Sequence, residues 1–208
     1  AASTDQTFTT ALAPDLEVTD IAIAQSNLIS GMQITVLWTS TNSGLGPTLR
    51  SWLDQLTVTN LSTGQRIFTT NVLYDATVLG SLASGASASR QATLRLPDSA
   101  AAVGQLLFTI TADATNAIAE FSGFGNAETN NIGNVTAIST LAPYPDLAIT
   151  DLVVPATGLP GQPVPITWAV TNQGNGPATG VWTESISLST DSLIGGDQLL
   201  TNVLQNLS

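Results

Sequence analysis

The side chains that could transfer protons or hold a metal are almost entirely carboxylates. The 208 residues include Asp+Glu 15 against Lys+Arg 4, with no His and no Cys. All of the cations are arginines, so the chain has no lysine for phosphate binding or Schiff-base formation. Without His or Cys there is no Ser-His-Asp triad, thiol nucleophile, zinc site or disulfide. These residues indicate a binding or structural protein, or an enzyme that works with carboxylates alone.

Two groups of acidic and amide side chains have the composition of a calcium site, because Ca²⁺ prefers several oxygen ligands. The members are Asp113, Asn116, Glu120, Asn126, Glu128 and Asn130 in the first group, and Asp191 and Asp197 in the second. Neither group has EF-hand or nonapeptide spacing, and Asx turns, in which such side chains cap their own backbone, explain the same residues. We predict no obligatory cofactor, with calcium as the alternative; an unchanged melting midpoint with chelator would remove that alternative.

A pair of carboxylates could also hydrolyse a glycosidic bond, which needs two of them about 5–10 Å apart in a cleft. Asp54 and Glu120 are the candidate pair, but nothing in the sequence places them together. We therefore predict that the chain is not an enzyme and has no catalytic residues.

The net charge of −11 argues against two classes of partner. A strongly negative surface repels nucleic acid and anionic membranes. No run of about 18 apolar residues is present, so we expect no transmembrane helix and no direct membrane insertion. The N-terminus lacks the basic and apolar regions of a signal peptide, so we expect a mature form, a fragment or a cytoplasmic chain.

The sequence contains an internal repeat, which predicts how the chain is divided into domains. The matching segments, in order, are 14–21 with 145–152, 38–47 with 168–177, Trp52 with Trp182, and Asp54 with Glu184. The offset of about 130 residues is the size of a whole domain rather than of a solenoid unit. We therefore predict that residues 1–13 are the tail of a preceding copy. Residues 14–142 would form a complete domain, and residues 143–208 the first half of a second, truncated one.

Apolar and polar residues alternate with a period of two, which is typical of half-buried strands and not of helices. Ile34 and Trp38 belong to one such run, and Ile132, Val135 and Ile138 indicate a looser last strand of the first copy. Turn clusters rich in Asn, Ser and Gly separate the runs, giving about seven strands per copy. The pattern predicts an all-β fold, an antiparallel β-sandwich in tandem copies.

The tryptophans come in matched pairs, which are Trp38, Trp52, Trp168 and Trp182. They are in phase with apolar neighbours, which favours core packing on adjacent strands over an exposed platform for sugars. Asp54 and Glu184 share this inward phase. Because a buried carboxylate needs hydrogen-bond partners or solvent, we expect each near the end of a sandwich, accepting bonds from residues 41–42 or 171–172.

Together these motifs resemble the CARDB family, the "cell adhesion related domain found in bacteria". The opening PDLxxTD, the WxxTNxGxGP run and the Wx[DE] motif occur in order in both copies. In the first copy, Asp113, Asn116, Ile118 and Glu120, followed by the pair 130–131, match the closing motif. The second copy has the aspartates of the family's middle loop, in segments 188–191 and 195–197, whereas the corresponding first-copy segment 59–64 has none. After Gly31, Met32 stands where the family pattern usually has Gln.

The resemblance implies an immunoglobulin-like β-sandwich, found in tandem in large surface or secreted proteins, with no enzymatic activity. We therefore expect an extracellular or cell-surface protein that acts as a spacer or in cell adhesion, with a protein or glycan at the cell surface as partner. The alternative is a self-assembling filament or surface-layer subunit whose partners are neighbouring copies of itself. In that alternative a strand donated by a neighbouring chain, such as residues 7–12, completes the second sandwich.

Overall fold

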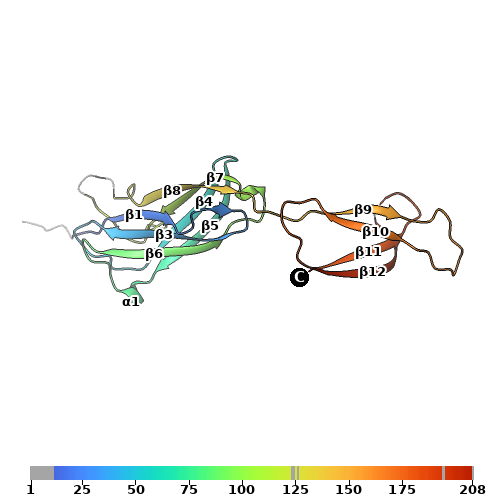
Figure 1. Cartoon of the computed structure of the whole chain (residues 1–208). Helices are drawn as coiled ribbons and strands as arrows, with labels where there is room; N and C mark the ends of the chain where they lie inside the picture. The colour runs from blue at the N-terminus through green and yellow to red at the C-terminus, as the bar shows by residue number, and fades with distance from the viewer. Residues whose placement is uncertain (1–11, 123–124, 126, 194, 208) are drawn as a thin grey trace, which may run out of the picture. The chain divides into compact units, whose positions relative to one another are not determined.

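The computed structural model describes residues 12–122, 125, 127–193 and 195–207. They fall into two compact units, Ala1–Ala142 and Pro143–Ser208, which are coloured blue to yellow and orange to red in Figure 1. The predicted tail at 1–13 and the donor segment 7–12 lie almost wholly outside the described residues, as does Asn126 of the first calcium group.

Two facing sheets form the first unit (Figure 1). In sheet order, the first contains β1 (Leu16–Ile23), β3 (Gln33–Asn42) and β6 (Ser87–Arg95). The second contains β2 (Leu28–Ile29), β8 (Ile132–Thr140), β7 (Gly104–Thr111), β4 (Trp52–Asn60) and β5 (Gln65–Tyr74). Neighbouring strands are antiparallel except β2 and β8, which are parallel. This is an immunoglobulin-like arrangement, and the predicted all-β antiparallel sandwich is confirmed.

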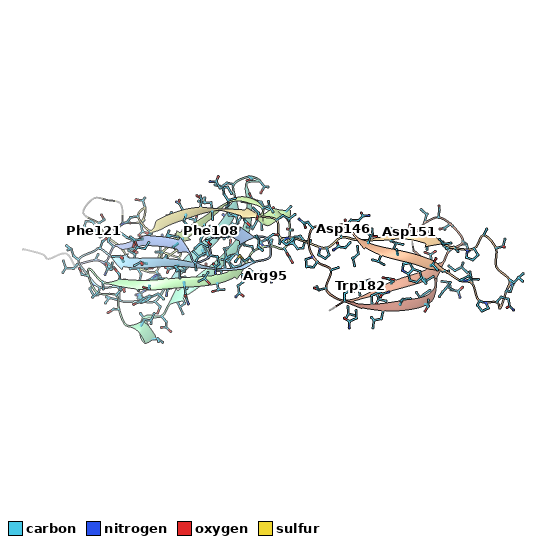
Figure 2. The ribbon with its side chains drawn as sticks, viewed as in Figure 1. Arg95, Phe108, Phe121, Asp146, Asp151 and Trp182 are labelled. Atoms are coloured by element: carbon cyan, nitrogen blue, oxygen red, sulfur yellow. The ribbon has the colours of Figure 1, made fainter. Side chains whose placement is uncertain are left out.

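The core of the first unit comes from the alternation predicted for its strands. Ile34, Val36 and Trp38 of β3 are buried and face the second sheet, where Leu56 and Phe108 are fully buried (Phe108 is labelled in Figure 2). The last strand differs from its prediction. Ile132 and Ile138 of β8 are exposed, and Gly133 instead faces inward, against Val18 and Ile21 of β1.

Two short helices complete the unit, α1 (Ala76–Leu79) and the 3-10 helix η1 (Ala100–Ala102). Each begins after a side-chain cap, since Asp75 accepts from the N–H of Thr77 and Ser99 from that of Ala101. Of the helices in the described ranges, none has the length and apolar character needed to span a membrane.

The second unit contains four described strands in two antiparallel pairs. One pair joins β9 (Leu147–Val153) to β10 (Thr167–Asn172), and the other joins β11 (Gly180–Leu188) to β12 (Gln198–Leu207). Strand β9 meets β10 as β1 meets β3: Leu147 lies opposite Asn172, and Leu16 lies opposite Asn42. Both pairs have a register shift, and in each the aspartate beside it has a positive φ, 53° at Asp20 and 50° at Asp151 (Asp151 is labelled in Figure 2).

Candidate functional site

A fully buried carboxylate, Asp54 on β4, lies between the two sheets of the first unit. Its Oδ1 accepts a hydrogen bond from Trp52 Nε1 at 2.8 Å. Its Oδ2 accepts from Trp38 Nε1 at 3.2 Å, from Ser40 Oγ at 3.4 Å and from Arg90 Nε at 3.0 Å. Because these donors occupy both oxygens and no solvent reaches the group, Asp54 has the surroundings of a structural carboxylate.

Arg90, on β6, balances the charge of Asp54 from the opposite sheet. It is itself buried, and it also donates from Nη2 to the carbonyl oxygen of Val72 at 3.0 Å. Its guanidinium lies 5.4 Å from the ring centroid of Tyr74, and that ring stacks on Trp52 with 3.8 Å between centroids. The cation, the carboxylate and the rings therefore form one connected polar core.

This geometry corrects two expectations about the carboxylate and its tryptophans. Asp54 accepts no bond from residues 41–42 but bonds to both tryptophans, Ser40 and Arg90. Trp38 and Trp52 do not lie on adjacent strands; they lie on β3 and β4, in the two facing sheets, and meet at one carboxylate between them. Alternation identifies the buried face of a strand but does not assign the strand to a sheet.

Sequence reasoning missed Arg90, although a signal for it was present. Arg90 occupies the inward phase of its strand, with Ala88, Ala92 and Leu94, and it is one of only four cations. An arginine in an apolar phase needs a buried anion, and Asp54 is the acid in an equivalent inward position.

The second unit repeats the pair of tryptophan bonds around Glu184 on β11. Trp168 donates to Glu184 at 2.6 Å and Trp182 donates at 3.0 Å (Trp182 is labelled in Figure 2). Gln205 of β12 adds a third bond at 3.4 Å. The hydrogen bond from Trp168 is the main cause that lowers the pKa of Glu184, against the opposing effect of partial burial. Glu184 and both tryptophans are only partly buried, and residues 143–208 contain no Lys or Arg.

A second shared feature is an asparagine at the end of the inner strand. Asn42 Oδ1 accepts from the N–H groups of Asp15 and Gly44 at 3.1 Å each, and its Nδ2 donates to the carbonyl of Gly46 at 2.8 Å. Asn172 makes the corresponding bonds, to Asp146, Gly174 and Gly176 (Asp146 is labelled in Figure 2). The TNxGxGP motif thus ties the start of each unit's first strand to its inner strand.

The predicted calcium residues of the first unit have different surroundings. Asp113 is buried with a positive φ of 42°, and its carboxylate accepts from the N–H groups of Ala117 at 2.9 Å and Ile118 at 2.6 Å. Asn116 is exposed, with a φ of 51°. Asn130 donates to Asp15 at 2.9 Å. Asp113 therefore accepts bonds from its own nearby backbone, as expected if these residues form Asx turns instead of a calcium site.

Glu120 is the perturbed acid of this region. Its Oε2 accepts from the N–H of Leu16 at 2.9 Å, and its other oxygen, Oε1, is buried. Burial is the largest cause that raises its pKa, from 4.5 to about 7, and the acids Glu128 and Asp113 add to the rise. Asp54, the other acid of the predicted glycosidase pair, is fully buried with both oxygens accepting hydrogen bonds, so it is not exposed to a substrate.

In the second unit, Asp191 and Asp197 lie in the connection between β11 and β12. Asp191 accepts from the N–H of Leu193 at 2.8 Å and Asp197 from that of Gly195 at 3.1 Å. The pKa of Asp197 is lowered, first by a hydrogen bond from Ser189. Within the described ranges, no three acidic side chains converge so as to hold a metal ion. Calcium at these residues stays a prediction.

The second unit has one further feature, an open groove between its two strand pairs. The groove has a volume of about 560 Å³, and Glu184 lines it together with apolar side chains. The apolar residues include Ile149, Leu152, Ile166, Trp168, Ile186 and Leu200. In the described chain, β10 pairs only with β9 and β11 only with β12, so each has one unpaired edge.

No protein-family model and no curated protein matches the chain. Among solved structures, it is similar to a crystal structure of the CARDB domain of the PF1109 protein from Pyrococcus furiosus in complex with di-metal ions. The identity is 18%, the alignment covers 64% of this chain and 100% of that one, and the TM-score is 0.41. A solution structure of the same domain gives 16% identity, coverages of 62% and 96%, and a TM-score of 0.39.

A Pseudomonas fluorescens alkylpurine DNA glycosylase, AlkC, bound to DNA is also similar, at 11% identity and a TM-score of 0.40, over 61% of this chain and 30% of that chain. The family that the motifs resemble is therefore found among the similar structures, in two structures of one CARDB domain. At these identities and scores, no activity, ligand or partner is transferred from any of them.

Proposed function

We propose that the chain is a non-catalytic β-sandwich module of a bacterial surface or secreted protein, acting as a spacer or in cell adhesion. The observation that supports this most is the state of Asp54: it is fully buried, and its oxygens accept four hydrogen bonds within the core. A catalytic carboxylate must instead reach its substrate. The composition agrees, because the chain has no His, Cys or Lys.

The partner in this proposal is a protein or glycan outside the cell. The test is a binding screen of the full chain against immobilised glycans and matrix proteins, with hydrolysis of a glycoside panel measured alongside. Saturable binding without turnover supports adhesion, and absence of both supports the spacer role. Turnover that Asp54→Asn abolishes would overturn the non-catalytic proposal.

We infer as a second candidate a subunit that assembles with neighbouring copies by strand donation. The supporting observation is the second unit, whose β10 and β11 edges and apolar groove lie open in the described chain. An open edge beside exposed apolar side chains readily accepts another strand. Sedimentation velocity over a range of concentrations should show growing oligomers, and deletion of residues 1–12 should abolish them. A monomer at every concentration contradicts this candidate.

A further inference from the structure

In the first unit, the outer face of the larger sheet carries no charged side chain on its three middle strands, β8, β7 and β4. Every second residue of these strands points away from the core, because side chains alternate across a sheet. In residues 52–60, 104–111 and 132–140, the outward positions hold only Thr, Asn, Gln, Leu and Ile. The chain as a whole has a net charge of −11, so this face is a neutral part of a strongly acidic molecule.

The strand register aligns the outward side chains in rows. One row crosses four strands, at Thr69 of β5, Thr57 of β4, Thr109 of β7 and Asn134 of β8. Neighbouring strands lie about 4.8 Å apart, and outward residues follow one another about every 6.7 Å along a strand. The hydroxyls of Thr57 and Thr109 make no hydrogen bond to another described residue. Each can therefore donate to a ligand and accept from it.

The second unit has the same kind of face, built from different residues. Gln55 and Ser185 occupy matching outward positions, each one residue after the inward acid of its unit. Gln55 donates to Asn71 on β5 at 3.3 Å. Ser185 donates to Asn202 on β12 at 2.8 Å. An uncharged hydrogen-bonding pair thus recurs at this position although the residue types have changed.

The smaller sheet of the first unit shows that an outer face of this fold accepts charge. Glu17 of β1 and Arg95 of β6 point outward there, opposite outward residues of β3. Charged side chains are ordinary at solvent-facing positions. Charge is therefore kept off one face of the sandwich and not off the other, which favours a role for the neutral face in contacts with an uncharged partner.

The chemistry of the face restricts its ligand further. The net charge of −11 repels polyanions, and the middle strands place no outward acid that could pair with a cation. The core of a protein interface is usually rich in aromatic side chains, and no outward residue of these strands is aromatic. A sugar chain without charges fits, since its hydroxyls match those of threonine and its C–H groups can pack on Leu107 and Ile138.

We propose that the outer faces of the β2–β8–β7–β4–β5 sheet and of the β11–β12 pair each bind a stretch of neutral polysaccharide. The row through Thr57 and Thr109 is the centre of the site in the first unit. Because no aromatic ring stacks on the sugar, each contact is weak, and a long polymer that engages both units gains avidity over a short one. The proposal rests on the adhesion role proposed above and names its ligand class and its site.

The test records amide NMR spectra of the full chain with three neutral polysaccharides, hydroxyethyl cellulose, galactomannan and dextran. Carboxymethyl cellulose is the matched control, because it has the same glucan backbone as hydroxyethyl cellulose with negative charge added. At least one neutral polymer should saturably shift or broaden the signals of outward residues on β4 and β7. Carboxymethyl cellulose should bind more weakly than hydroxyethyl cellulose, because the net charge repels it.

Two double variants locate the site. Thr57→Val with Thr109→Val removes both central hydroxyls but keeps β-branched side chains, and should weaken binding to the first unit about fivefold. The matched control is Thr35→Val with Thr93→Val, a pair on the outer face of the smaller sheet whose hydroxyls lie 3.1 Å apart. That control should bind as the unaltered chain does. Melting curves show whether each variant is folded, and the comparison of neutral with charged cellulose needs no variant.

Equal losses in the two double variants, or shifts confined to residues outside the two faces, would overturn the proposal. So would tighter binding of carboxymethyl cellulose than of hydroxyethyl cellulose. No binding of any neutral polymer also refutes the proposal, but it leaves the spacer role and adhesion to a protein unaffected. Hydrolysis of a polymer bound at these faces would support the binding site and overturn the non-catalytic function.

Discussion

Asp54 and Glu184 occupy matching positions in the two units, and two tryptophan side chains donate to each. Around Asp54, β6 adds Arg90, and Tyr74 stacks on Trp52, so the acid is sealed in a core. Around Glu184, Gln205 takes the position opposite Trp182 that Tyr74 holds opposite Trp52, and the group stays partly open. The comparison separates what a carboxylate–tryptophan cluster needs to form from what it needs to be buried.

Two tryptophan donors are common to both clusters, while Gln205 adds a donor to Glu184, and Ser40 and Arg90 add donors to Asp54. Full burial needs a cation as well, because desolvating an unpaired charge costs more than neutral hydrogen bonds return. The two units thus show the same cluster with and without its counter-ion.

The largest difference in lost unfolding free energy between the two units should come from truncating the matching tryptophans. Trp52→Ala removes a fully buried ring and should cost about 3–5 kcal/mol of unfolding free energy. Trp182→Ala removes a partly buried ring with no stacking partner in the described chain and should cost about 1–2 kcal/mol. Denaturant titrations followed by the remaining indole N–H signals report each unit separately. Equal costs would contradict the difference in packing.

The second-largest loss of stability should come from removing Arg90, the counter-ion of Asp54. Arg90→Ala leaves Asp54 buried without its cation and should destabilise the first unit by about 3 kcal/mol, the lower end for a broken buried pair because the tryptophan donors remain. The matched control is Arg95→Ala on the same strand, whose ion pair with Asp98 is exposed and 3.6 Å long. That control should cost less than about 1 kcal/mol. Similar losses for both arginines would show that Arg90 does not compensate Asp54.

Substituting the glycines of the shared TNxGxGP motif should lower the stability of both units by similar amounts. A Cβ on Gly44 would overlap the backbone of Pro14 and Asp15, and one on Gly174 would overlap Tyr144 and Asp146. Gly44→Ala and Gly174→Ala should each cost about 1–3 kcal/mol, because the entering chain must move away. The same denaturant titration tests both, with exposed Gly64→Ala as a comparison for positive φ without steric contact. A large cost in one unit alone would mean that the two corners differ.

The smallest expected effect is a pH dependence confined to the first unit. Glu120 has its pKa raised to about 7 in the folded state, against 4.5 ordinarily. Between these values the folded state binds more protons than the unfolded state, so stability should fall as pH rises through this window. Glu120→Gln should flatten the profile and be more stable than the unaltered chain above pH 7, by about 1 kcal/mol after allowance for solvent screening. An unchanged profile would contradict the assignment, and Asp20→Asn, at an exposed acid of the same unit, serves as the control.

Much of the fold could be predicted because period-two alternation is a local property. Ile34, Val36 and Trp38 are buried as their spacing indicates. The last strand was harder, since β8 turns Gly133 toward Val18 and Ile21 of β1 and exposes Ile132. Neither the facing of Trp38 and Trp52 across two sheets nor the pairing of Arg90 with Asp54 is local. The inward phase of Arg90 indicates that it is buried, but its partner depends on which strands become neighbours, and residue spacing does not show that.

The parallel pairing of β2 with β8 has a mechanical consequence. Leu28 lies opposite Ser139 and Ile29 opposite Thr140, and the N–H of Ser30 adds a bond to the carbonyl of Thr140 at 2.9 Å. Strand β2 follows the entering strand β1, and β8 is the last strand of the unit. Because β2 and β8 are parallel, tension that reaches them from the two ends of the unit pulls them in opposite directions along their axes. The hydrogen bonds between β2 and β8 are then loaded simultaneously in shear, instead of breaking one after another.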